Sequence, residues 1–228
     1  MNSDFIRTSL QAIALCVAAI GGYGQTTISS LPFTITQSGT YTFSQVLTFS
    51  SVGGGQAITI AASNVVIDLK GYELKANPTG AGRGIESSNR FVNLIIRNGT
   101  ISGFQFGVAV LNVTTGCTIQ NVQFSNNETS INLQNSVSCI VQNCLVFGTG
   151  AGTGIQVSGC EGVQVKNTQL ANWAFGVTSD GGNAFLENYI GGCSTGLQLG
   201  TGDKYQGNVT SGCATPFSGG TAVGTENN

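Results

Sequence analysis

Short alternations of apolar and polar residues recur along most of this chain. Each begins after a small residue and runs apolar, polar, apolar, which is typical of a half-buried β-strand. The segments that share this pattern are Gly84-Ile85-Glu86-Ser87, Gly107-Val108-Ala109-Val110, Ser130-Ile131-Asn132-Leu133, Gly154-Ile155-Gln156-Val157, Gly176-Val177-Thr178-Ser179 and Gly196-Leu197-Gln198-Leu199. A second and a third alternating run follow each of these, so we expect three strands in every repeat.

An asparagine marks the end of the second run in six repeats. These asparagines are Asn98, Asn121, Asn143, Asn167, Asn188 and Asn208, which are almost evenly spaced along the chain. In an earlier repeat Gly71 takes the same place. Because Gly and Asn most readily adopt left-handed backbone, this column predicts a sharp bend between the second and third strands. Stacked asparagines can also hydrogen-bond to one another.

A nearly fixed period with three strands per repeat predicts an all-β solenoid. We expect three parallel sheets and about seven coils over residues 57–215. Residues 25–56 would form cap strands at the amino-terminal edge, and residues 216–228 would form a cap or tail at the other end. In the second strands, the residues expected to face inward include the pairs Leu94/Ile96, Cys117/Ile119 and Ala184/Leu186.

These residues together resemble the right-handed parallel β-helix proteins of the pectate lyase-like (pectin lyase-like) superfamily. The resemblance covers about residues 57–215, and the segment 63–74 is similar to the first full coil of many small, exported, repeat-only members. It implies a right-handed β-helix. The chemistry has to be found among the residues of this chain, because a fold does not determine an activity.

Residues 1–24 have the pattern of a secretory signal peptide. Arg7 supplies positive charge, Leu10 to Ile20 is an apolar run, and Gly22 and Gly24 are small residues before a cut at Gln25. The apolar run is too short to cross a bilayer comfortably. We therefore expect a secreted, periplasmic or cell-surface protein with no transmembrane segment in the mature chain.

Composition narrows the classes of partner. Charged residues make up only 8% of the chain and the formal net charge is -2, so we expect no nucleic-acid binding. The cysteines show no spacing typical of a metal site, and we expect no metal or cofactor. Cys193 and Cys213 share a turn position one coil apart, where a disulfide and two free thiols are both compatible with the pattern. For Cys117 and Cys139 we favour a buried ladder of thiols.

Catalytic chemistry finds little support in the sequence. The chain has no histidine, which excludes triads that depend on one. Glu86 and Asp180 are the acids expected on the outward face of the first sheet, four coils or about 19 Å apart. Paired glycosidase carboxylates lie about 5 to 10 Å apart. The remaining catalytic candidate is the corner of Arg83, Glu86 and Arg90, for which a solvated ion pair is the simpler interpretation.

The outward column of the first sheet suggests binding instead. Asn132, Gln156 and Gln198 could hydrogen-bond sugar hydroxyls, and Trp173 could either stack on a sugar ring or pack in the core. The leading hypothesis is an exported, non-catalytic protein that presents a polar surface to carbohydrate or to a cell-surface partner. One alternative is a polysaccharide lyase or related carbohydrate-active enzyme. Another is a structural envelope component that assembles through outward apolar residues, among them Phe185. The oligomeric state is left open.

Overall fold

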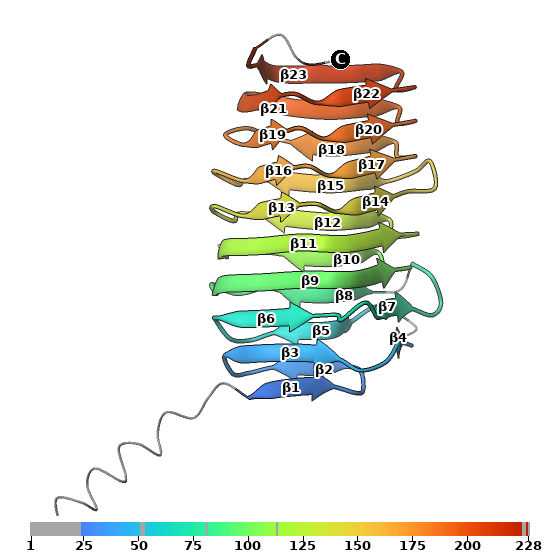
Figure 1. Ribbon diagram of the computed structural model, residues 1–228, viewed down its shortest axis with the longest axis vertical. Coiled ribbons are helices and arrows are strands. Elements are labelled where there is room, and N and C mark those ends of the chain that lie inside the picture. Colours follow the sequence, from blue (N-terminus) through green and yellow to red (C-terminus); the bar gives the residue numbers. More distant parts are fainter. Residues whose placement is uncertain (1–23, 51–52, 81, 113, 225–226, 228) are drawn as a thin grey trace, which may run out of the picture.

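The alternating runs of each repeat fold into strands that pair only with the turns directly above and below. The computed structural model describes residues 24–50, 53–80, 82–112, 114–224 and 227. Residues 1–23 of the expected signal peptide lie outside the described residues. Every strand pairing is parallel, and the turns stack from β1 at one end to β23 at the other (Figure 1). The chain is therefore a parallel β-helix, as its period predicts.

Three sheets run along the solenoid. The first contains β2 (Phe33–Ile35), β5 (Gln56–Ile60), β8 (Arg83–Ser87), β10 (Phe106–Val110), β12 (Thr129–Gln134), β15 (Thr153–Ser158), β18 (Phe175–Ser179) and the beginnings of β21 (Thr195–Gln206) and β23 (Thr215–Ala222). The second contains β1 (Gln25–Ile28), β3 (Gly39–Phe43), β6 (Val65–Asp68), the first parts of β9 (Val92–Ser102) and β11 (Thr115–Ser125), then β13 (Ile140–Gln142), β16 (Gln164–Lys166), β19 (Ala184–Leu186) and the ends of β21 and β23. The third contains β4 (Leu47–Phe49), β7 (Glu73–Ala76), the second parts of β9 and β11, then β14 (Leu145–Phe147), β17 (Gln169–Ala171), β20 (Tyr189–Gly191) and β22 (Val209–Ser211).

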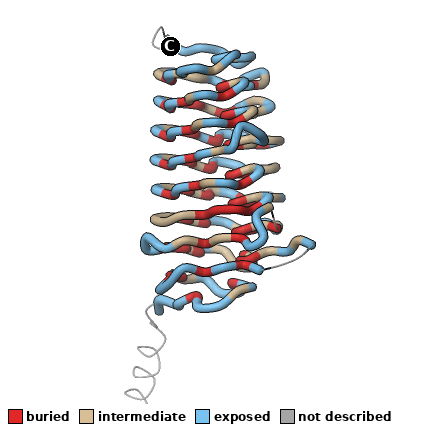
Figure 2. The backbone as a smooth tube through the Cα atoms, turned by 90° about the vertical axis from the view of Figure 1, so that its right-hand side faces the viewer, coloured by how far each residue is buried: buried red, intermediate tan, exposed pale blue. Residues whose placement is uncertain are grey.

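The apolar position of each strand faces a continuous core. Leu94 and Ile96 in β9 and Cys117 and Ile119 in β11 are fully buried, as their alternation predicts. Figure 2 shows these buried stretches repeating from turn to turn. Since each turn contacts only its neighbours, the core is a stack of layers along the axis.

The amino-terminal residues expected to form a cap lie in the same three sheets. Strands β2, β3 and β4 pair in register with β5, β6 and β7, and so form one more turn of the solenoid. Strand β1 pairs with β3 and covers its edge. With this turn the solenoid has about eight turns, against the seven expected from residues 57–215.

One strand has the opposite face inward from the one expected. The prediction that Ala184 and Leu186 face the core is wrong, because Phe185 is fully buried and Asn183 is 3% exposed. Strand register pairs Phe185 with Val165, which also faces inward. A shift of one residue reverses the faces of a strand. Phe185 is therefore not part of an outward apolar surface.

The asparagine column holds in four turns and shifts in two. Asn98, Asn121, Asn143 and Asn167 have φ between 49° and 60°, and Gly71 has φ of 83°. The expectation does not hold for Asn188 and Asn208, because Glu187 and Gly207 take the left-handed backbone in their turns. Strand register pairs Lys166 with Leu186 and Gln169 with Tyr189. Thr168 is therefore the counterpart of Asn188.

The two shifted asparagines point into the core instead of outward. Asn188 and Asn208 are buried, and each accepts a hydrogen bond on Oδ1 from the backbone of the turn below: Thr168 N to Asn188 at 3.1 Å and Asn188 N to Asn208 at 3.0 Å. Asn227 extends this column, since its Oδ1 accepts from Asn208 N at 3.2 Å. The outward asparagines make a side-chain contact of 3.4 Å from Asn121 Nδ2 to Asn98 Oδ1.

Candidate functional site

The outward face of the first sheet carries a register-matched column of mostly polar residues. It reads Thr34, Thr59, Glu86, Ala109, Asn132, Gln156, Thr178, Gln198 and Ser218. Parallel in-register pairing places each of these side chains about 4.8 Å from the next along the axis. The sequence-predicted residues Asn132, Gln156 and Gln198 therefore lie on one face, within four consecutive turns.

A depression of about 370 Å³ hollows this face across β15, β18 and β21. The side chains that give it its chemistry are Gln156, Ser158, Phe175, Thr178, Asp180 and Gln198. Phe175 lies in the flanking column, in register with Thr153 and Thr195, and its side chain is 38% exposed. The depression thus combines an open aromatic ring with amides, hydroxyls and one carboxylate.

Asp180 is the only ionisable side chain among the residues that line the depression. Its Oδ2 accepts a hydrogen bond of 2.6 Å from the backbone of Gly159 and one of 3.1 Å from Ser158 Oγ. These donors hold the carboxylate against the turn of the neighbouring coil. The site is therefore weakly anionic, and its lining residues include no cation to hold an acidic ligand.

Asn132 lies one turn below Gln156 in the same outward column, yet it is only 3% exposed. Its Oδ1 has no hydrogen-bond partner among the described residues. Leaving a buried acceptor unpaired costs about 1–3 kcal/mol, and such atoms are uncommon in folded proteins. Because Asn132 is buried and is not among the residues that line the depression, this acceptor is not open to a ligand on the outward face.

Trp173 is not available to stack on a ligand. It is 1% exposed, and its Nε1 donates a hydrogen bond of 3.1 Å to Val146 O inside the core. The aromatic ring at the surface is that of Phe175, two residues further along. Strand alternation does not predict this exposure, because it places Phe175 on the same face as the inward Val177, whereas Phe175 is exposed at the start of β18.

The catalytic candidates of the first turns are only partly brought together. Glu86 is 4% exposed and forms an ion pair with Arg83, whose guanidinium lies 5.7 Å from the centre of the Phe106 ring. Arg90 is exposed, and no described contact joins it to Glu86. Four turns separate Glu86 from Asp180, so these two outward carboxylates are not a closely spaced pair.

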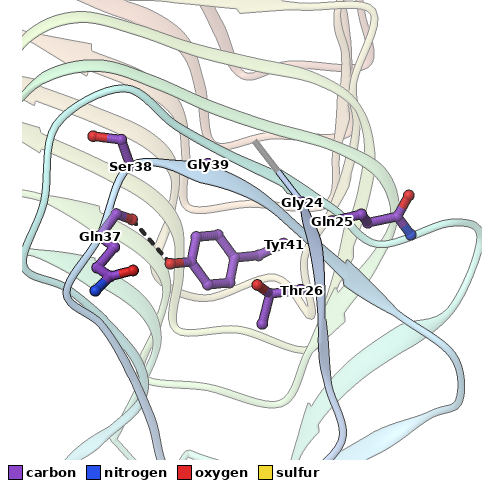
Figure 3. A pocket seen from close by; sticks show the side chains of 7 residues that line it. All are labelled: Gly24, Gln25, Thr26, Gln37, Ser38, Gly39 and Tyr41. Atoms are coloured by element: carbon purple, nitrogen blue, oxygen red, sulfur yellow. Dashed lines mark hydrogen bonds between the residues drawn. The ribbon is translucent and has the colours of Figure 1, made fainter. Parts of the chain in front are cut away.

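Two other hollows lie away from this face. One, of about 530 Å³, is at the amino-terminal end beside Tyr41, whose hydroxyl donates to Gln37 O at 2.9 Å (Figure 3). The other, of about 650 Å³, lies between the β7–β8 and β14–β15 loops and contains one carboxylate, that of Glu128. Across the described ranges, no three potential ligands among His, Cys, Asp and Glu come close enough to hold a metal ion. Neither hollow has an acid–base pair among its lining residues.

Asp68 is a buried acid that the fold uses in an ion pair. Burial alone would raise its pKa, but hydrogen bonds from Lys70 N and Asn98, together with Arg97, lower the pKa below its ordinary value. Arg97 Nε donates to Asp68 Oδ2 at 2.9 Å. This ion pair lies on the outward face of the second sheet, where it ties β6 to β9.

In the part of the chain that the structure describes, no helix has the length and apolar character needed to cross a membrane.

Two solved structures similar to this chain are of the tailspike protein of E. coli bacteriophage HK620, each a mutant in complex with a pentasaccharide. One has a TM-score of 0.57 and 16% sequence identity, and the match covers 90% of this chain and 41% of the tailspike chain. The other has a TM-score of 0.49 and 13% identity, with 90% and 46% covered. This chain thus spans less than half the length of either tailspike chain, and at such identities the likeness concerns the fold.

No curated protein matches the chain. The family described as "Right handed beta helix region" matches residues 34–214, most of the solenoid. Parallel strands in register, three sheets and this match agree with one another, and the chain belongs to the right-handed β-helix family.

Proposed function

We propose that this protein binds neutral carbohydrate, without cleaving it, in the depression on its first sheet. The observation that carries the proposal is the exposed ring of Phe175 set among Gln156, Thr178 and Gln198. An aromatic ring offers an apolar surface to the C–H face of a sugar, and the amides and hydroxyls around it can donate to and accept from sugar hydroxyls.

The charges favour a neutral ligand over an acidic one. Asp180 is the single charged group among the residues that line the depression, and an acidic sugar beside it would meet a like charge. Of the arginines in the first turns, Arg83 is paired with Glu86 and Arg97 with Asp68, and neither they nor Arg90 lines the depression. The partner of this surface would therefore be a neutral polysaccharide, free or on a cell surface.

The absence of cleavage is part of the proposal. General acid–base hydrolysis of a glycoside requires two carboxyl groups about 5 to 10 Å apart. On this face Glu86 and Asp180 are separated by four turns, about 19 Å at the sheet spacing. The similar tailspike structure with the TM-score of 0.57 holds a pentasaccharide, which supports a carbohydrate ligand for the fold without assigning its site here.

We further propose that the protein acts outside the cytoplasm. This rests on the signal-peptide pattern of residues 1–24, in which Arg7 precedes the apolar run from Leu10 to Ile20. Export would bring the polar face into contact with extracellular or envelope polysaccharide.

Binding to a panel of neutral and acidic oligosaccharides, followed by calorimetry on those retained, tests the proposal. Phe175→Ala and Gln156→Ala should each weaken binding by about two- to tenfold or more, since one hydrogen bond or ring contact contributes about 0.5–1.5 kcal/mol. Gln164→Ala is the matched control, because Gln164 is an exposed glutamine on the second sheet.

Three results would count against the proposal. If Gln164→Ala weakened binding as much as Gln156→Ala, the sugar would not lie on the first sheet. New reducing or unsaturated ends in the incubated oligosaccharide would overturn the non-catalytic assignment and favour a lyase or hydrolase. Retention of acidic oligosaccharides alone would overturn the assignment to neutral sugars.

A further inference from the structure

Two cysteines stack in the last two turns of the solenoid. Cys193 and Cys213 follow Gly192 and Gly212, whose left-handed φ values of 60° and 66° form the same bend in each turn. Ala214 N donates to Cys193 O at 3.2 Å, so the two bends lie directly over each other. Stacked turns about 4.8 Å apart fall within the Cα separations of about 4.4–6.8 Å found in disulfides.

The two thiol groups converge on the same stretch of backbone. Cys193 Sγ lies 3.5 Å from Gly191 O in its own turn. Cys213 Sγ lies 3.6 Å from Ile190 O, which belongs to the turn below, so this side chain leans toward Cys193. Burial, the larger cause, and the neighbouring Cys213 thiol raise the pKa of Cys193 to about 11.

Access to solvent differs between the two sulfurs. Cys213 is half-buried at the surface, whereas Cys193 is 3% exposed. Among the six described cysteines, the other five are all buried. Cys117 and Cys139 also stack in adjacent turns, but each is only 1% exposed. A reagent in solution therefore reaches Cys213 before any other described thiol.

We propose that Cys193 and Cys213 are a disulfide-forming pair that staples the last two turns when the protein meets a small disulfide such as glutathione disulfide. The Cys213 thiolate attacks one sulfur of the small disulfide, which forms a mixed disulfide and releases one glutathione thiolate. The Cys193 thiolate then attacks Cys213 Sγ and displaces the second glutathione. Two protein thiols are oxidised, two glutathione thiols are produced, and the departing thiolates take up the two protons.

The staple would act where a solenoid is least stable. A terminal turn has a neighbour on one side only, and here most of β22 and β23 is exposed. The turn below it carries Gln198, which pairs in register with Ser218 of β23. Joining Cys193 to Cys213 would hold the last turn over the end of the first sheet.

The positions of the basic residues make the linkage directly measurable. Lys204 lies between the two cysteines, so trypsin places Cys193 in the peptide 167–204 and Cys213 in the peptide 205–228. Cys117, Cys139, Cys144 and Cys160 all fall in one other peptide, 98–166. The folded full-length chain is treated with glutathione disulfide, unfolded in iodoacetamide and digested without reduction. We expect 167–204 joined to 205–228 until a reductant is added, with the four cysteines of 98–166 alkylated.

Two variants separate the steps. Cys193→Ser should leave glutathione trapped on Cys213, because the second attack has no nucleophile. Cys213→Ser should leave Cys193 free, because its thiol is buried. In the wild-type protein, trypsin should cut the folded chain at Lys204 more slowly after oxidation, and neither variant should show this change.

The proposal is overturned if the wild-type digest yields 167–204 and 205–228 as separate alkylated peptides after oxidation. It is also overturned if Cys213→Ser collects glutathione on Cys193 as fast as the wild-type protein forms the crosslink. Oxidation within 98–166 while Cys193 and Cys213 stay free would likewise contradict it.

Discussion

Asn188 Nδ2 donates a hydrogen bond of 2.9 Å to Asn208 Oδ1 inside the solenoid. The same nitrogen donates to Val165 O at 2.9 Å, and Asn188 Oδ1 accepts from Thr168 N. The buried side-chain amide of Asn188 is thus hydrogen-bonded both to the turn below, at Thr168 and Val165, and to the turn above, at Asn208. In these last turns, a hydrogen-bonded amide occupies the inward position that Val122 and the thiol of Cys144 occupy in earlier turns.

Replacing Asn188 with Ala should lower the free energy of unfolding by about 1–3 kcal/mol, because the substitution removes the side-chain acceptor of the buried Thr168 N. Urea denaturation monitored by circular dichroism measures the change. Asn121→Gly is the control, since Asn121 is exposed with φ of 54° and glycine keeps that backbone. If both variants lost the same free energy of unfolding, the buried hydrogen bonds of Asn188 would contribute no more to stability than the exposed side chain of Asn121.

Glu187 occupies the left-handed position that asparagine holds in the turn below. Its φ is 54° and its side chain is exposed. A residue with a Cβ and a long side chain pays about 1–2 kcal/mol for this backbone, whereas asparagine adopts it readily. Glu187→Asn should therefore stabilise the protein by about 1 kcal/mol, seen as a higher denaturation midpoint. Glu161→Asn is the matched control at an exposed glutamate outside the left-handed region, where we expect a change within about 0.5 kcal/mol. A stabilisation of equal size at Glu161 would contradict the conformational explanation.

The shift between Glu187 and Asn188 shows what the sequence could and could not predict. The period and the alternation are enough for the solenoid, because both follow from strand geometry. The asparagine column steps from Asn167 to Asn188, whereas strand register steps from Lys166 to Leu186 and so puts Glu187 above Asn167. A residue-type column cannot detect this shift, since it assumes that asparagine always bends the chain. Register is decided by the burial of Phe185, and that assignment reverses the faces of the strand.

The sequence could predict which residues of the candidate site lie on the outward face of the first sheet, but not which of them are exposed to solvent. Gln156 and Gln198 lie where the alternation places them, and both line the depression. Asn132 has the same outward register and yet is buried, which depends on the packing of neighbouring side chains over it. Spacing assigns a residue to a face of a strand, whereas solvent access depends on side chains from other turns.

Acidification should destabilise the protein in part through Asp68. The pKa of its carboxyl is lowered from 3.8 in the folded state, so its contribution to stability is fully present above about pH 4 and is lost as the pH falls through the folded value. The free energy of unfolding should therefore drop as the pH falls below about 4. Asp68→Asn should be less stable at neutral pH, because Arg97 loses its partner, and should show a shallower drop on acidification. Parallel pH profiles for the two proteins would mean that Asp68 does not contribute this dependence.

Trp173 and Phe175 should separate stability from binding. Trp173→Phe removes the ring nitrogen that donates to Val146 O and leaves a small void, so we expect about 1–3 kcal/mol of destabilisation with unchanged affinity for a bound sugar. Phe175→Ala removes an exposed ring and should change stability by less than about 1 kcal/mol while weakening sugar binding. Denaturation and calorimetry on both variants measure the two effects. If Trp173→Phe weakened binding and Phe175→Ala did not, the exposed ring of Phe175 would not be a sugar contact, and the proposed site on the outward face would be wrong.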